Sequence, residues 1–362
     1  MLGTSEEHRP RAPTQPAVPR WGVALALLAL LGLAWAARTS NRAQVFTPDG
    51  VVLGEFDPYY HVWRVFQTLR DYPHVPVFDP AMNHPKGAVV IWPPLFDLGI
   101  ATAARLAGHG PRDVDAVERL AARVPPLLGA LSVLPVFFLA RRLLGDSRWA
   151  LLATTVFAFT PIHVWYSRLG FVDHHVAVTL AQALMLLAFL RGLDVFRDGP
   201  AVGAGARAAA VGAGVATLVF GLLVWNGFVF FVFLLDLALL GALWVERERA
   251  GSRLWLLGLA SHLPAALLVI PFVRQVVARS GQPFSPLTLS WLEVVALLAC
   301  AAVCGLEGLR RAAAGRGLSA RARQAVLALP LAAAALAVLP FLPRLAQGFE
   351  WLTASDTFMA SV

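Results

Sequence analysis

Two short polar segments of this chain contain side chains that could bind a metal ion. In the segment 167–175 (SRLGFVDHH), Asp173 and His175 are separated by one residue. Where the backbone is not regular helix, that spacing lets a carboxylate oxygen and an imidazole face one divalent ion. Asp173 could equally cap a helix that follows, so this segment alone leaves both interpretations open.

The second polar segment, 55–64, has the sequence EFDPYYHVWR. It predicts a helix that starts with Asp57 as N-cap and Pro58 in the first helical position. The predicted apolar face consists of Tyr59, Val62, Trp63, Phe66 and Leu69. A helix start does not explain the polar neighbours His61 and Arg64. Asp57 is therefore the candidate carboxylate that could complete a metal site with Asp173 and His175.

The rest of the composition places these polar segments in a membrane protein. Of the 362 residues, 58% are hydrophobic and only 14% are charged, which excludes a disordered chain, a coiled coil and an ordinary soluble enzyme. An ionisable side chain at membrane depth costs about 2.5–3.5 kcal/mol, so three polar residues in a row at 173–175 need a reason.

Apolar runs of spanning length predict about nine transmembrane helices. The first covers 21–37 and follows a polar, predicted disordered N-terminus at 1–20. A cleavable signal peptide is the alternative for that run, and an uncleaved helix is favoured by the many later spans. Those later runs lie at 121–144, 148–166, 174–192, 207–225, 227–245, 253–273, 287–306 and 325–343. A shorter run at 94–107 could be re-entrant or interfacial, within a long first loop at 38–120.

Arginine placement orients the predicted bundle. With a cytoplasmic N-terminus, the inside segments hold 17 arginines and the short outside loops hold four. The long loop and the segment at 166–173 then face outside together. The net charge of +8 is accordingly interpreted as a topology signal and not as a nucleic-acid surface.

At these residues the chain resembles a known family. EFDPYYHVWR, the stretch 78–97 with its WPPLFD sequence, and SRLGFVDHH are similar to motifs of the catalytic subunit of oligosaccharyltransferase, especially of archaeal type. The resemblance implies an all-α, polytopic membrane bundle of the GT-C glycosyltransferase type, with short helices in the long first external loop. It also implies that Asp57, Asp173 and His175 are catalytic and ligate Mn²⁺ or Mg²⁺. Four more polar residues of the two segments are predicted to bind substrate: His61, Arg64, Arg168 and His174.

The same resemblance implies an activity, namely transfer of a glycan from a polyprenyl-(pyro)phosphate-linked donor to asparagine in Asn-x-Ser/Thr sequences. The expected partners are this lipid-linked donor, an acceptor polypeptide and membrane lipid. The family also has a glutamate-containing loop and a soluble domain after its ninth helix. Here a transmembrane domain at 21–344 is followed by the start of an external loop at 345–362, so we expect an incomplete enzyme that a separate C-terminal polypeptide could complete.

Two other functions stay open at this point. One is a sister glycosyltransferase that uses a polyprenyl-monophosphate sugar, and the other is a transporter or a non-catalytic remnant. A transporter usually places polar groups near the midplane of the membrane, whereas the densest cluster here lies in an outer loop. Cys300 and Cys304 are predicted to be packing residues. Ionisable residues inside a membrane often have a function, but hydrogen bonds between helices explain Asp236 and His262 equally well.

Overall fold

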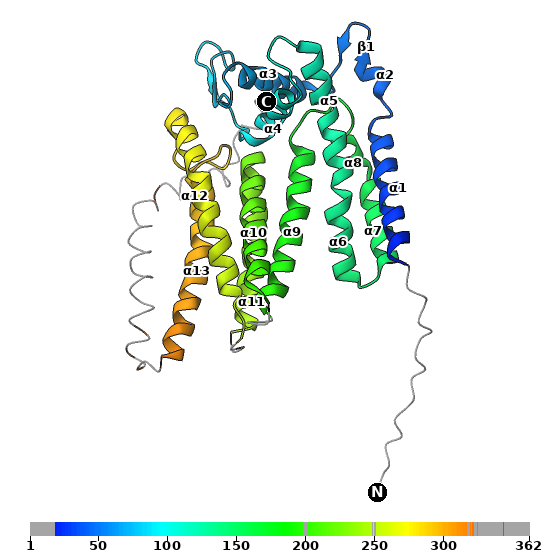
Figure 1. Cartoon of the computed structure of the whole chain (residues 1–362). Helices are drawn as coiled ribbons and strands as arrows, with labels where there is room; N and C mark the ends of the chain where they lie inside the picture. Colours follow the sequence, from blue (N-terminus) through cyan, green and yellow to red (C-terminus); the bar gives the residue numbers. More distant parts are fainter. Residues whose placement is uncertain are drawn as a thin grey trace, which may run out of the picture.

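The apolar runs form helices because a bilayer offers backbone groups no water, so each N–H must bond within its own segment. In the computed structural model, long helices run side by side and the short elements between α1 and α5 gather at one end of them (Figure 1). The structure describes residues 19–197, 202–247, 249, 251–316, 319, 321, 324 and 343. The predicted disordered tail, apart from its last two residues, therefore lies outside the described part, as do nearly all of the run at 325–343 and the whole of 345–362.

Seven helical segments of the described chain are long and apolar enough to cross a bilayer. They are α1 (Arg20–Arg38), α5 with α6 (Val114–Leu131 and Val133–Leu144), α9 (His175–Arg197), α10 (Ala204–Val224), η2 with α11 (Asn226–Phe228 and Val229–Val245), α12 (Leu254–Ser280) and α13 (Trp291–Gly315). The chain is thus an all-α, multi-pass membrane protein, as predicted. The expected number of nine spans is not reached among the described residues.

One predicted span, 148–166, is wrong as a single helix. It divides into α7 (Ser147–Ala158) and α8 (Pro161–Trp165). Proline lacks a backbone N–H and disfavours helical geometry in the residue before it, and Thr160 accordingly has φ −57° and ψ 123°. At 12 residues, α7 is about 18 Å long and too short to cross a membrane alone.

The cap at one end of the bundle is built from short elements. In chain order these are α2 (Arg42–Val45), β1 (Phe46–Thr47), β2 (Gly50–Val51), α3 (Phe56–Arg70), β3 (Phe78–Asp79), β4 (Ala88–Val89) and α4 (Leu95–Leu106). Both strand pairs are antiparallel two-stranded hairpins, with Phe46 opposite Val51 and Phe78 opposite Val89. The predicted run at 94–107 is α4, which packs against α3, α5 and α10 and so lies between the cap and the bundle.

Small residues bring the spanning helices close together. A Cβ on Gly214 of α10 would lie 2.6 Å from Ser261 Oγ of α12, and one on Gly308 of α13 would lie 2.6 Å from the Trp255 ring. Helices in a bilayer gain little from the hydrophobic effect and associate through such close backbone approach. The α9–α13 half of the bundle is held in this way beneath the cap.

Candidate metal and substrate site

Helix α3 buries a polar face, which the apolar pattern did not predict. Its N-cap is Glu55, at φ +85° and without a side-chain cap bond, so the prediction of Asp57 as N-cap is wrong. Tyr59, predicted to be on the buried face, is 51% exposed, whereas His61 and Arg64 are fully buried. Buried charges need partners, and these come from α4 and from the segment that precedes α9.

The segment before α9 is fixed by backbone and side-chain bonds to α1 and the cap. The Leu169 N–H donates to the Arg38 carbonyl at 2.8 Å, and the Gly54 N–H donates to the Gly170 carbonyl at 3.1 Å. The buried Arg38 side chain also donates from Nε to Ser167 Oγ at 2.7 Å. The bond between Gly54 and Gly170 ties the start of α3 to the start of α9, so the two predicted polar segments do lie together.

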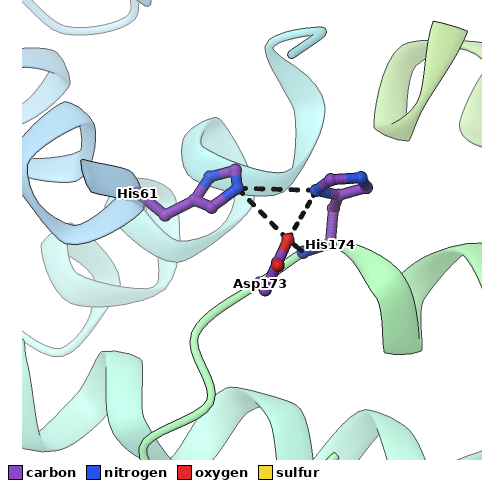
Figure 2. A group of neighbouring side chains, drawn as sticks. All are labelled: His61, Asp173 and His174. Carbon is purple, nitrogen blue, oxygen red and sulfur yellow. Dashed lines mark hydrogen bonds and ion pairs between the residues drawn. The ribbon is translucent and has the colours of Figure 1, made fainter. Parts of the chain in front are cut away.

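Three buried side chains meet where these segments join (Figure 2). Asp173 Oδ1 lies 2.6 Å from His174 Nδ1 and 3.4 Å from His61 Nε2, and the two imidazole nitrogens are 3.5 Å apart. All three side chains offer a ligand atom within 4.8 Å of the others, which could hold a metal ion. We call this group, with His175, the Asp173 cluster.

A second carboxylate, Asp97 of α4, orients His61 by contacting the ring nitrogen that faces away from Asp173. Its Oδ1 lies 2.7 Å from His61 Nδ1, and its Oδ2 forms an ion pair of 2.6 Å with Arg64 Nη1. Burial disfavours the charged imidazole, but Asp97 and Asp173 outweigh that effect and raise the pKa of His61 to about 9. A histidine whose other nitrogen is held by a carboxylate is the arrangement common behind metal sites.

The other oxygen of Asp173 faces the second predicted histidine. His175 Nε2 lies 3.3 Å from Asp173 Oδ2, and the His175 side chain is 48% exposed. Burial favours the neutral acid, yet hydrogen bonds from His174 and His61 hold the pKa of Asp173 well below its usual range. The carboxylate is therefore ionised, with one imidazole on one side and two on the other.

Asp57 lies in the first turn of α3, where its side chain is exposed and makes no hydrogen bond or ion pair within the described residues. It stands four residues before His61, so the two lie on neighbouring turns of one helix face. The structure thus unites Asp173 with His175, and in the part of the chain that it describes Asp57 is an unpaired carboxylate on the helix that contacts Asp173.

Arg168, a predicted substrate residue, lies outside the Asp173 cluster. Its guanidinium stacks 3.5 Å above the Trp165 ring and borders Gly54. His61, Arg64 and His174, the other predicted substrate residues, are buried in or behind the cluster. Sequence reasoning missed the role of Asp97, although the WPPLFD stretch that ends on it is one of the motifs that carry the family resemblance.

A cavity of about 440 Å³ opens beside the exposed His175 ring. The Tyr166 and His175 ring centroids are 4.6 Å apart at its wall. Aromatic and aliphatic side chains and a few polar groups line it: Phe157, Thr160, Ile162, His163, Tyr166, His175, Val176, Val178, Thr179, Gln182, Trp225 and Phe231. An apolar chain with a polar head is the kind of ligand that suits such a lining.

Comparisons with known proteins agree with this architecture. Residues 25–303 match the family model described as oligosaccharyl transferase STT3, N-terminal. The chain is 32% identical, over 164 residues, to dolichyl-phosphooligosaccharide-protein glycotransferase 1 of Archaeoglobus fulgidus. That alignment covers 44% of this chain and 27% of the relative.

Solved structures show the same fold. One is the archaeal oligosaccharyltransferase AglB of A. fulgidus in complex with an inhibitory peptide and a dolichol-phosphate (TM-score 0.75, 23% identity, 94% of this chain and 39% of that one). Another is an A. fulgidus oligosaccharyltransferase in complex with zinc and sulfate (TM-score 0.71, 24% identity, 87% of this chain and 39% of that one). The chain therefore spans about a quarter to two fifths of the length of these proteins.

Proposed function

Since the match over residues 25–303 shows that the chain belongs to the STT3 N-terminal family of oligosaccharyl transferases, we propose that it is the membrane-embedded part of such an enzyme. The proposed reaction moves a glycan from a polyprenyl-(pyro)phosphate-linked donor to the asparagine side chain of an Asn-x-Ser/Thr acceptor. The Asp173 cluster, which buries all its members except His175 and lies at the end of a transmembrane helix beside a cavity, is the observation that carries this proposal.

Two residues of the Asp173 cluster, together with Asp57 of α3, offer ligand types that fit a divalent cation. We assign Asp57, Asp173 and His175 as ligands of Mn²⁺ or Mg²⁺, and the closeness of Asp173 to His175 and the place of Asp57 on α3 support this set. When bound, such an ion supplies positive charge that stabilises a departing phosphate group. Imidazole nitrogen lies outside the oxygen preference of Mg²⁺, so this set favours Mn²⁺.

The neighbouring residues have separate proposed tasks. Asp97 holds His61 in place, and the His61 contact in turn fixes the orientation of the Asp173 carboxylate. The polar side of the site consists of His174, Arg64 and His61. Arg168, near the rim of the site, offers its guanidinium to an anionic group of the donor. The cavity beside His175 would receive the first isoprenoid units of the donor lipid.

The proposal includes a place in the cell and further partners. The proposed location is the cell (inner) membrane, and the arginine distribution supports a cytoplasmic N-terminus with the Asp173 cluster at the outer face. Because the chain spans 27% of its curated relative, we propose that acceptor binding involves sequence beyond these residues or a separate C-terminal polypeptide.

A transfer assay tests the function. Membranes containing the full chain receive Mn²⁺, a polyprenyl-pyrophosphate-linked oligosaccharide and a fluorescent peptide with Asn-x-Thr, and mass spectrometry detects the glycopeptide. A peptide with Gln in place of Asn should stay unmodified, and Asp173→Asn should lose the product. His84→Ala, which changes an exposed histidine of the cap, is the matched control and should keep it.

Three outcomes would contradict the proposal. One is the absence of glycopeptide from wild-type membranes that are also supplied with the C-terminal polypeptide proposed to bind the acceptor. The second is equal product from Asp173→Asn. The third is transfer only from a polyprenyl-monophosphate sugar, which would assign the chain to the sister class of glycosyltransferases instead.

A further inference from the structure

A second cluster of potential metal ligands lies deep in the bundle, away from the cap. It consists of Asp236 of α11, His262 of α12 and Cys300 of α13, and all three are buried. They stand seven to nine residues from the nearer ends of their helices, or about 10–14 Å at 1.5 Å per residue. The sequence pattern did not join them, because they come from three separate helices. We call them the intramembrane cluster.

Hydrogen bonding fixes the protonation of the His262 ring. Its Nδ1 lies 2.9 Å from the carbonyl oxygen of Gly258, four residues earlier on α12. A carbonyl only accepts, so Nδ1 carries a hydrogen and donates it. In a neutral imidazole the lone pair is then on Nε2, which lies 2.8 Å from Asp236 Oδ1.

Two lone pairs cannot face each other at hydrogen-bond distance unless a cation lies between them. At 2.8 Å that cation is a proton, and a metal ion that took its place would bind both atoms as ligands. The thiol of Cys300 would supply a third ligand to such an ion, because Asp236, His262 and Cys300 each offer a ligand atom within 4.8 Å of the other two.

Charge balance permits a divalent metal in this part of the protein. An ion of charge +2 with one carboxylate and one thiolate gives a site of zero net charge, which a low-dielectric interior tolerates best. Nitrogen, sulfur and one carboxylate oxygen are the ligand types of zinc, and the second nitrogen of a zinc-bound histidine typically donates to a carbonyl or carboxylate.

We propose that Asp236, His262 and Cys300 form an intramembrane site for a thiophilic divalent cation of the zinc class, which joins α11, α12 and α13. The ligands are deprotonated on binding, and the cation enters as the helices assemble, because the cluster is buried. A small exogenous ligand such as water would complete a tetrahedron, as in other sites with three protein ligands.

Cys304 provides a control within the same helix. It lies one turn after Cys300 and packs against Gly258, where a Cβ would come within 2.3 Å of its sulfur. Cys304→Ser therefore changes an equally buried thiol that is not among the proposed ligands. Asp173→Asn is a second control, since it alters only the cap site.

The test uses Co²⁺ as a spectroscopic substitute for zinc in the full chain, purified in detergent after growth with added cobalt. Wild type, Cys304→Ser and Asp173→Asn should show a thiolate-to-cobalt charge-transfer band with about one ion per chain retained at this site. Cys300→Ser should lose the band. Any of three results would overturn the proposal: no band in wild type, a band that persists in Cys300→Ser, or a band that is lost in Cys304→Ser alone. If Cys300→Ser fails to fold, Cys304→Ser decides, because Cys300 is then the one cysteine of the 362-residue sequence that remains.

Discussion

His61 joins two carboxylates from distant parts of the chain, because its Nδ1 lies 2.7 Å from Asp97 and its Nε2 lies 3.4 Å from Asp173. Arg64, one helical turn further along α3, binds the other oxygen of Asp97. The four side chains alternate in charge, and all are buried. The geometry of the candidate site therefore depends on α4 as much as on the two segments that carry the predicted ligands.

Removal of the Asp97 charge should destabilise the cap strongly. Asp97→Asn keeps the shape but leaves the Arg64 guanidinium buried without its counter-ion, which typically costs about 3–5 kcal/mol. Asp71→Asn is the matched control, because the ion pair of Asp71 with His74 is exposed and worth about 1 kcal/mol or less. Thermal unfolding in detergent measures both variants, and equal losses would contradict the buried role of Asp97.

Mn²⁺ should stabilise the folded protein through the proposed ligands. At an ion concentration about 100-fold above the dissociation constant, binding adds about 2.7 kcal/mol of stability. The double variant Asp57→Ala with His175→Ala should abolish the Mn²⁺-dependent rise in Tm, and the single change His84→Ala should leave it intact. A full Mn²⁺ response in the double variant would exclude this ligand set and direct attention to His61 and His174.

A methyl group at Gly129 should disturb the anchor of the segment before α9. A Cβ there would lie 2.5 Å from Arg38 Nε and 2.6 Å from the Ser167 Cβ, so Gly129→Ala must displace the contact between them. We expect a loss of about 1–3 kcal/mol in unfolding free energy and reduced transfer activity.

Gly99→Ala is the control for that change, because Gly99 is also helical but a Cβ at this position would have no atom within 4 Å. Its better helix propensity should stabilise the protein by about 0.5–1 kcal/mol. An unfolding free energy of Gly129→Ala equal to that of Gly99→Ala would contradict the close packing of Gly129 against Arg38.

Filling the cavity beside His175 should affect the lipid donor and not the metal. Thr179 lines this cavity, and Thr179→Trp would occupy part of its 440 Å³. We expect a higher KM for the lipid-linked donor with an unchanged Mn²⁺ response in thermal unfolding. Thr155→Trp, on an exposed face of α7, should change neither quantity. A donor KM equal to that of wild type in Thr179→Trp would place the lipid elsewhere.

Much of the architecture could be predicted from the sequence because a bilayer imposes simple requirements. Long uncharged runs must become helices, and most of the predicted runs coincide with spans such as α10 and α11. The run at 148–166 shows the limit of hydropathy, since Thr160 before Pro161 interrupts the helix without changing the mean apolar character.

The interior of the candidate site could be predicted only in part. Asp173 and His175 are two residues apart, so their pairing follows from local spacing and is found. The burial of His61 and Arg64 depends on Asp97, which is more than 30 residues away, and no local pattern encodes that charge balance. The intramembrane cluster could not be predicted for the same reason, because its members come from three helices that are separate in the sequence.

The buried contact between Arg38 and Ser167 also has a consequence for biosynthesis. The two residues are 129 positions apart, so at about 5–20 residues per second a ribosome needs roughly 6–26 s to make the second after the first. During that interval the guanidinium at the end of α1 can remain hydrated at the membrane surface. Burial of Arg38 is then a late event in the assembly of the protein, and it coincides with the emergence of the segment that carries Asp173.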